Sequence, residues 1–225
     1  MTGFRLSIVV PALNEAPVIE AALAALAPLR ARGHEVVLAD GGSEDATREL
    51  AKPLADRIVV APRGRARQMN AGAAEANGDA LLFLHADTRL PANADELIFH
   101  SLQESMWGRF DVAIEGRSPL LPAIAFLMNL RSRLTGIATG DQAIFVRRGM
   151  FGGFPEIALM EDVAFSKAMK RGAPPACLRA KVVTSGRRWD QQGALRTMLL
   201  MWRLRLAYFL GAAPDDLARR YANKA

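Results

Sequence analysis

Residues 80–88 read ALLFLHADT, and this stretch decides the fold that we predict for the chain. Five residues dominated by Leu and Phe run directly into His85, Ala86 and Asp87. A strand that is apolar on both faces is typical of a parallel sheet covered by helices, and such sheets bind ligands beyond the C-terminal ends of their strands. We therefore predict a buried strand that ends at a ligand-binding position, Asp87. The alternative is that Asp87 begins a turn or caps the helix after Pro91.

Three further apolar runs precede this stretch, and each is followed by a pattern typical of a helix. We predict strands at 6–10, 35–40 and 57–62. The first helix is expected over 18–29, the second from the Gly-rich turn after residue 40 to about residue 55, and the third over 64–78. Strand and helix thus alternate four times, which predicts an α/β fold with a doubly wound, mostly parallel sheet flanked by helices.

The pattern is less regular after Pro91. We expect helices over 92–104, 122–136, 161–172 and 194–211, and strands over 107–116, 141–148 and 181–189, the first of which can join the sheet antiparallel. No linker rich in Ser, Pro or Gly separates these parts. Residues 1–225 are therefore expected to form one domain that ends in an apolar helix and a polar tail.

The composition limits the classes of partner. The chain has 225 residues, of which 51% are hydrophobic, and a formal net charge of +6, which suits a nucleotide diphosphate or an acidic lipid surface. No zinc-finger spacing and no basic run with interleaved aromatics points to nucleic acid, so no nucleic-acid partner is expected. Cys177 is the only cysteine, which excludes internal disulfides and fits a cytoplasmic location. The N-terminal apolar run is too short for a signal peptide.

Acidic side chains follow three of the predicted strands. Glu15 follows the first strand, Asp40 ends the second, and Asp87 follows the fourth. Each acid alone is explained by a helix cap or a tight turn. Because parallel strands end at the same edge of a sheet, we expect the three to lie together, where they can bind a base, a ribose and a metal ion.

Basic side chains follow the third strand. The loop PRGRARQMN places Arg63, Arg65 and Arg67 around a helix start, where guanidinium groups and helix N–H groups can bind a diphosphate. The alternative is a solvated basic face. Arg65 and Gln68 lie off the predicted apolar stripe of this helix, so we expect both to be free to face a ligand.

The motifs SIVVPALNE, LADGGSEDAT, FLHADT and MEDVAF, in this order, resemble a family 2 glycosyltransferase with the GT-A fold over roughly residues 5–190. The segment GRARQMNAGA resembles a small bacterial subgroup of that family. The resemblance implies a nucleotide-binding half at 1–90, an acceptor and catalytic half at 91–190, and a C-terminal helix and tail at 191–225. It implies an inverting transfer from a nucleotide-diphosphate sugar, and the residues expected to bind this donor are Pro11, Ala12, Glu15, Asp40, Arg65, Arg67 and Asp87.

The resemblance also implies a divalent metal, Mn²⁺ or Mg²⁺. Asp87 matches the last acid of the family's metal-binding triplet, whereas His85 stands where many members have the first Asp. A carboxylate at this position can bind a hard cation that bridges the oxygens of a nucleotide diphosphate.

Glu161 and Asp162 match the family's catalytic pair, in which the second acid is the usual base. An acceptor hydroxyl must lose its proton as it attacks the anomeric carbon, and a nearby carboxylate can accept that proton. An isolated pair of acids would instead be explained by stabilisation of a helix N-terminus. Downstream, GRRW at 186–189 resembles a basic segment near the departing diphosphate, and surface packing explains it equally well.

The apolar helix LRTMLLMWRLRLAYFLG contains Arg196, Arg203 and Arg205, so we do not expect it to span a bilayer. It can pack on the back of the sheet or form a homodimer contact. Together with segment 119–130 it can also bind an anionic membrane surface. The last alternative leads to the hypothesis of a peripheral enzyme at the inner face of the cell membrane whose acceptor is apolar or lipid-linked, rather than a soluble small molecule.

Two other functions remain as alternatives. A nucleotidyltransferase on a related fold would need a Gly-rich, basic loop after the first strand, where this chain has PALNE. A non-catalytic, membrane-associated protein that binds nucleotide sugars would be favoured by loss of an acid among Asp40, Asp87 and Asp162, and all three are present.

Overall fold

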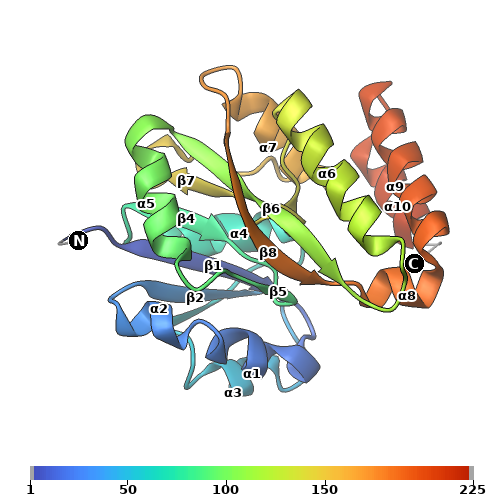
Figure 1. Ribbon diagram of the computed structural model, residues 1–225. Helices are drawn as coiled ribbons and strands as arrows, with labels where there is room; N and C mark the ends of the chain where they lie inside the picture. The colour runs from blue at the N-terminus through green and yellow to red at the C-terminus, as the bar shows by residue number, and fades with distance from the viewer. Residues whose placement is uncertain (1–2, 223–225) are drawn as a thin grey trace.

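The computed structural model describes residues 3–222, which build one curled eight-stranded sheet with helices on both faces (Figure 1). The strands are β1 Leu6–Ala12, β2 Glu35–Asp40, β3 Arg57–Val60, β4 Ala80–Phe83, β5 Thr88–Arg89, β6 Trp107–Glu115, β7 Phe145–Arg147 and β8 Ala176–Ser185. The helices are α1 Ala16–Ala24, α2 Ala27–Ala31, α3 Thr47–Ala51, α4 Arg65–Ala74, α5 Ala94–Glu104, α6 Leu121–Thr135, α7 Glu161–Met169, α8 Arg187–Gln192, α9 Ala194–Phe209 and α10 Pro214–Ala222. Two short 3₁₀ helices, η1 Gly140–Gln142 and η2 Arg148–Met150, flank β7.

The strand order is β3-β2-β1-β4-β7-β6-β8-β5. The first four strands of this order are parallel, which confirms the prediction of a parallel sheet in the first half of the chain. β6 pairs antiparallel with β7, but β7 also pairs antiparallel with β4. β7 is therefore the strand that runs against this part of the sheet. β6, for which the sequence allowed an antiparallel arrangement, runs in the direction of β4 and pairs parallel with β8.

Side chains alternate across the sheet and build a core on each face. Ile8 and Val10 of β1 face a core that includes residues of α1, α2, α5 and α6, whereas Val9 faces one that includes α4 and α7. This alternation is the two-residue period of a strand, and both faces are apolar because both are covered.

Several element bounds differ from those predicted. The helix expected over 18–29 is two helices, because Pro28 provides no N–H for a continuous helix and starts α2 instead. The fourth strand ends at Phe83, so His85 and Asp87 lie in a loop. β5, which the sequence did not predict, follows this loop and pairs with β8.

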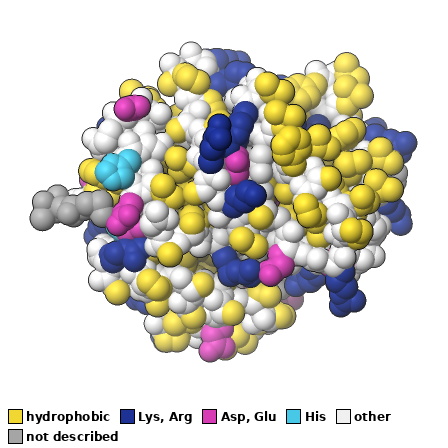
Figure 2. Space-filling model, viewed as in Figure 1, with side chains coloured by type: hydrophobic (Ala, Val, Ile, Leu, Met, Phe, Trp, Pro, Cys, Tyr) yellow, Lys and Arg dark blue, Asp and Glu magenta, His cyan; other side chains and the backbone are white. Residues whose placement is uncertain are grey.

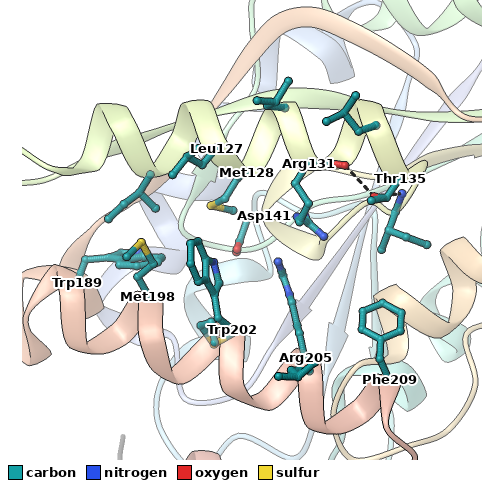
Figure 3. A pocket seen from close by; sticks show the side chains of 16 residues that line it. Leu127, Met128, Arg131, Thr135, Asp141, Trp189, Met198, Trp202, Arg205 and Phe209 are labelled. Carbon is teal, nitrogen blue, oxygen red and sulfur yellow. Dashed lines mark hydrogen bonds between the residues drawn. The ribbon is translucent and has the colours of Figure 1, made fainter.

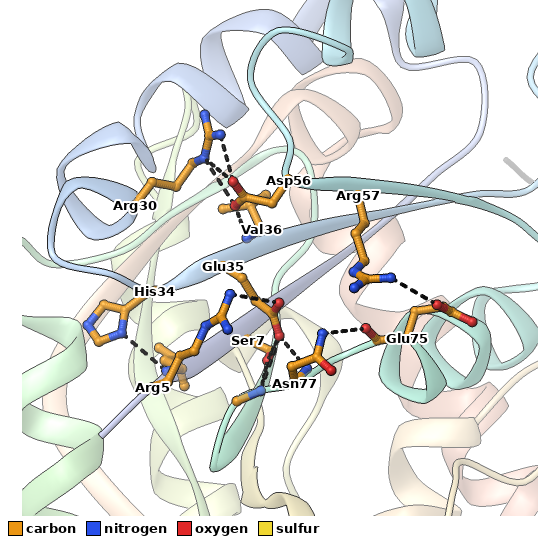
Figure 4. A network of polar contacts seen from close by, with 12 residues as sticks. Arg5, Ser7, Arg30, His34, Glu35, Val36, Asp56, Arg57, Glu75 and Asn77 are labelled. Carbon is orange, nitrogen blue, oxygen red and sulfur yellow. Dashed lines mark hydrogen bonds and ion pairs between the residues drawn. The ribbon is translucent and has the colours of Figure 1, made fainter. Parts of the chain in front are cut away.

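A polar cluster fixes the opposite end of the sheet, at the starts of β1 and β2 (Figure 4). The buried carboxylate of Glu35 accepts hydrogen bonds from Ser7 Oγ and from the backbone N–H groups of Asn77 and Gly78. Burial raises the pKa of Glu35, but these bonds outweigh that effect and hold the pKa below its usual value. Because Ser7 is opposite Glu35, the cluster holds the register that places Ala12 opposite Asp40 at the other end.

The C-terminal helix α9 contributes to the main core on the sheet only near its N-terminus, through Ala194 and the partly buried Met198. Its principal neighbours are α8 and α10, and Leu204 joins a small separate core with Leu217 and Val163. α9 and α10 lie beside α6, at the side of the molecule away from β1 and β2 (Figure 1). Within residues 3–222, no helix combines the length and the apolar character needed to cross a membrane.

Candidate functional site

A cavity of about 310 Å³ lies at the C-terminal ends of β1 and β4, beside the start of α4. It is lined by Pro11, Ala12, Leu13, Glu15, Arg63, Gly64, Arg65, Gln68, His85, Ala86 and Asp87. Five of the residues that the sequence predicts to bind a donor therefore lie around one space: Pro11, Ala12, Glu15, Arg65 and Asp87. The cavity combines exposed guanidinium groups with two carboxylates, which suits an anionic ligand and its counter-ion.

The loop after β1 is held in place by the loop after β2. Asn14 has a left-handed backbone conformation with φ 54°, and its Oδ1 accepts a hydrogen bond from the Glu44 N–H at 2.9 Å. The N–H groups of Asn14 and Glu15 donate to Ser43 Oγ and Thr47 Oγ1 at 2.9 and 2.8 Å. These bonds fix the position of Glu15 at the cavity.

Glu15 and Asp87 differ in their surroundings. Glu15 is half-buried, and burial raises the pKa of its carboxyl against the lowering effect of Arg187, while the charge of Asp87 raises the pKa further. Asp87 is exposed, and its Oδ1 accepts a hydrogen bond from Thr88 Oγ1 at 3.3 Å. Arg187 of α8 is thus close enough to act on the charge of this site.

Asp40 does not line the cavity. It is fully buried, and its Oδ2 accepts hydrogen bonds from the N–H groups of Gly42 and Ser43 at 3.0 and 2.9 Å. Its Oδ1 is also buried and has no partner among the described residues. Asp40 therefore shapes the Gly-rich turn through Oδ2, whereas Oδ1 remains without a hydrogen-bond donor among the described residues.

Two side chains of α4 are placed differently from our expectation. Arg67 does not line the cavity and forms an exposed ion pair with Glu156 at 3.3 Å. Gln68 borders the cavity, but its Nε2 is not free to bind a ligand, because it donates to the carbonyl oxygens of Ala12 and Ala39 at 2.6 and 3.1 Å. Gln68 therefore joins the ends of β1 and β2.

The two acids at the start of α7 lie beside this cavity. A space of about 10 Å³ is lined by Glu161 and Asp162 and also by Arg65 and His85, which both line the larger cavity. Glu161 is buried, and burial, followed by the charge of Asp162, raises the pKa of its carboxyl, although Arg65 Nη1 lies 3.6 Å from Oε1. The structure thus brings the predicted acid pair to the edge of the predicted donor site.

Asp162 is oriented by the backbone. Its Oδ2 accepts a hydrogen bond from the Gly140 N–H at 2.9 Å, and its Oδ1 accepts one from the Val163 N–H at 2.7 Å. The side chain is half-buried, so a ligand can still approach the remaining lone pairs. This is the arrangement expected of a positioned proton acceptor.

His85 connects these groups to a residue that the sequence reasoning missed. His85 Nδ1 lies 3.5 Å from Asp141 Oδ1, and His85 Nε2 is buried without a partner among the described residues. Gly140 packs against the ring so closely that a Cβ there would lie 2.5 Å from Nε2. The sequence signal for this segment is a Gly-Asp pair in a polar stretch just before a strand.

A second, apolar space begins at Asp141. A groove of about 640 Å³ runs between α6 and α9 and is lined mainly by Leu, Met, Trp and Phe side chains, together with Arg131, Asp141 and Arg205 (Figure 3). Trp202 and Phe209 are each more than half exposed, and hydrophobic side chains cover this part of the surface in Figure 2. The two apolar segments of the sequence therefore face each other across a groove that begins near the acid pair.

The residues of the donor cavity can be tested for their fit to a divalent metal. Residues 3–222 contain no group of three or more His, Cys, Asp or Glu side chains placed to bind one. A Mg²⁺ ion in a nucleotide site, however, usually takes only one or two carboxylates, and phosphate and water oxygens supply the other ligands. The exposed carboxylate of Asp87, beside the arginines that suit a diphosphate, fits a metal site that the bound nucleotide completes.

Comparison with known proteins finds a family and several relatives. The profile described as glycosyl transferase family 2 matches residues 7–158. A PGL/p-HBAD biosynthesis glycosyltransferase of Mycobacterium tuberculosis is 33% identical over an alignment of 172 residues, which covers 68% of this chain and 62% of that protein. The protein of the same name from Mycobacterium bovis matches equally. The chain thus spans less than two thirds of the length of these relatives.

Three solved structures show the same fold. A mannosyltransferase of Pyrobaculum calidifontis, solved with GDP-Man and Mn²⁺, has a TM-score of 0.65 and 21% identity, covering 99% of this chain and 70% of that one. S. aureus TarS, solved with UDP-GlcNAc, has a TM-score of 0.64 and 18% identity, covering 81% of this chain and 58% of that one. Glucosyl-3-phosphoglycerate synthase of M. tuberculosis, solved with Mn²⁺ and UDP, has a TM-score of 0.58 and 20% identity, covering 81% of this chain and 71% of that one. The α/β fold with its curled sheet matches these GT-A structures, as the sequence predicted.

Proposed function

The chain belongs to glycosyl transferase family 2, and from this premise we propose that it transfers a sugar from a nucleotide-diphosphate donor to an acceptor hydroxyl with inversion at the anomeric carbon. The observation that carries the proposal is the position of Arg65 and His85, which line both the donor cavity and the space beside Glu161 and Asp162. A donor diphosphate and an acceptor proton can therefore be handled within one site.

The donor is bound at the ends of β1 and β4. Arg63 and Arg65 bind the diphosphate, and Arg187 offsets the charge that develops as the nucleotide departs. Asp40 lies at the end of β2, and because its side chain is fully buried it supports the donor site by shaping the Gly-rich turn rather than by direct contact. Asp87 would hold Mn²⁺ or Mg²⁺ through its carboxylate, and a metal bound there would supply further positive charge beside the leaving diphosphate.

The acceptor is activated by Asp162. The acceptor oxygen attacks the anomeric carbon from the face opposite the diphosphate, the bond from this carbon to the diphosphate oxygen breaks, and Asp162 takes the hydroxyl proton. One displacement inverts the centre, with no covalent sugar-enzyme intermediate. Glu161, which burial keeps more readily protonated, orients Arg65 rather than accepting the proton.

The groove between α6 and α9 binds an acceptor with an apolar part. It begins at Asp141, whose neighbour Gly140 donates to Asp162. The exposed hydrophobic side chains along it suit a lipid-linked acceptor, and they can also bring the enzyme to a membrane surface from the cytoplasmic side.

The test is a thermal-shift screen of uridine and guanosine diphosphates and their sugars, with and without Mn²⁺. A ligand at 100 times its dissociation constant should stabilise the fold by about 2.7 kcal/mol. Arg65→Gln should weaken the shift, whereas Arg67→Gln, two residues away on the same helix and paired with Glu156, should not. A screen in which no nucleotide stabilises the wild type would contradict the proposal.

A further inference from the structure

Two arginine side chains extend toward each other across the apolar groove. Arg131 comes from α6 and Arg205 from α9, and their guanidinium groups lie to the right of Asp141 in Figure 3. Both line a space that is otherwise walled mainly by hydrophobic side chains. Guanidinium groups are seldom left in such surroundings without an anionic partner.

Neither guanidinium has such a partner in the part of the chain that the structure describes. Nε and Nη2 of Arg131 and Nε of Arg205 are buried without a hydrogen-bond partner, and neither side chain forms an ion pair with a residue in the range 3–222. Asp141, the acid that lines the same groove, has its ion-pair contact with His85 at 3.5 Å, and the charge of Arg205 is only a minor cause of the lowered pKa of its carboxyl. Burial, followed by the charge of Arg205, lowers the pKa of Arg131 to about 10, although the charge of Asp162 acts in the opposite direction.

We propose that the groove binds an anionic amphiphile, in which a phosphate or carboxylate group bonds to Arg131 and Arg205 while an apolar chain or ring fills the space beyond them. Guanidinium groups bind both kinds of anion through paired N–H donors. The groove has the volume of a site for a small organic molecule. The inference rests on the proposed function, because such a ligand would present an acceptor hydroxyl toward Asp162.

Charge complementarity within the groove favours this ligand over a flat surface. The unpartnered nitrogens are buried between two helices, so an anion must enter the groove to reach them. A membrane surface would instead meet the exposed basic residues of α9, such as Arg196 and Arg203. A second copy of the protein could cover the apolar rim of the groove, but such a contact would not by itself bring an anionic group to Arg131 and Arg205.

The experiment measures binding of decyl phosphate, decanoate and decanol, each below its aggregation concentration. Trp189 and Trp202 line the groove, so their fluorescence reports binding, whereas Trp107 is buried in the core. The wild type should bind decyl phosphate or decanoate at least about tenfold more tightly than decanol. Comparison of decyl phosphate with decanoate identifies the preferred anionic group. Inorganic phosphate tests whether the alkyl chain of the ligand is needed for binding.

Matched variants locate the binding. Arg205→Gln and Arg131→Gln should bring decyl phosphate to the affinity of decanol, whereas Arg203→Gln, on the exposed face of the same helix, should leave it unchanged. Arg205→Lys should recover part of the affinity, and far-UV circular dichroism checks that each variant is folded. The wild-type comparison of the three decyl compounds needs no variant at all.

Several outcomes would overturn the inference. Equal affinity for decanol and decyl phosphate would show that the anion is not recognised, and equal affinity for inorganic phosphate and decyl phosphate would show that the apolar part is not. Concentration-dependent dimerisation that quenches tryptophan fluorescence would indicate that a second copy covers the groove. Binding to phosphatidylglycerol vesicles that Arg203→Gln and Arg205→Gln weaken equally would indicate a membrane surface. UDP-induced thermal shifts are measured in parallel. A normal UDP shift without amphiphile binding refutes this inference alone, whereas amphiphile binding without any nucleotide shift refutes the proposed function.

Discussion

Replacement of Asp162 by Asn tests the proposed base and has two separable consequences. The first is loss of transfer, because an amide cannot accept the proton of the acceptor hydroxyl. A positioned general base contributes roughly 10²–10⁴-fold to a rate, so turnover should fall by that factor. Donor binding should survive, because Asp162 lies at the smaller space and not in the donor cavity.

The second consequence is a modest loss of stability. Asp162 accepts the Gly140 N–H at 2.9 Å and the Val163 N–H at 2.7 Å, one at each carboxylate oxygen. The Asn side chain has only one acceptor oxygen, so one of these N–H groups loses its partner, at a cost of about 1–3 kcal/mol. Relief of the repulsion with Glu161 offsets part of this cost. In a domain of this size each kcal/mol lowers Tm by about 2–4 °C.

The assay measures release of the nucleoside diphosphate with the donor that the thermal-shift screen identifies. Asp216→Asn, an exposed acid paired with Arg219, serves as the matched control and should retain turnover and Tm. Asp162→Ala should be equally inactive but less stable than Asp162→Asn, because it loses both acceptors. Turnover of Asp162→Asn within tenfold of the wild type would refute the reasoning and assign the role of base to Glu161.

Three further predictions concern the metal, the acid pair and the sheet. Asp87→Ala should weaken nucleotide-diphosphate binding with Mn²⁺ present and change little in EDTA, and unchanged wild-type affinity in EDTA would contradict the metal role. Glu161→Gln should increase the free energy of unfolding at pH values above the raised pKa of the Glu161 carboxyl, because only the ionised form of the native side chain is disfavoured by burial. At pH values below the ordinary pKa of 4.5 this increase should disappear. A difference in unfolding free energy that stays constant in urea titrations from pH 4 to 8 would exclude this cause. Gly78→Ala should destabilise the fold by more than about 1 kcal/mol, because a Cβ would lie 2.5 Å from Ser7 Oγ and 2.7 Å from Arg5 O, and urea unfolding measures it.

The first half of the fold was predictable because its signals are local. Each of β1, β2 and β4 is a short apolar run, and the alternation with helices leaves a parallel sheet as the simplest solution. Because parallel strands share one edge, the convergence of Glu15 and Asp87 followed from the same pattern. The second half was less predictable, because the pairing of β7 between β4 and β6 joins segments far apart in the chain.

The roles of individual residues on α4 depend on packing that a sequence pattern does not contain. Gly72 lets this helix approach the sheet so closely that a Cβ there would lie 2.6 Å from Val9 Cγ1. At this separation Gln68 is drawn between the ends of β1 and β2, and Arg67 is turned toward Glu156. The predicted apolar stripe left Arg65 free to face the cavity, as it does, but the stripe could not distinguish a side chain that faces a cavity from one that bonds to the strands beside it.

The C-terminal helix shows why its arginines could not be assigned from sequence. Other helices already cover both faces of the sheet, so α9 packs on α8 and α10 and buries only Ala194, Thr197 and Leu204. The sequence presents its arginines as equivalent charges, which favours attraction to an anionic surface. The structure separates Arg205, which enters the groove, from Arg203, which faces away from it. Surface attraction requires Arg203→Gln and Arg205→Gln to act alike, whereas a ligand in the groove requires them to differ, so this pair of substitutions decides between the two.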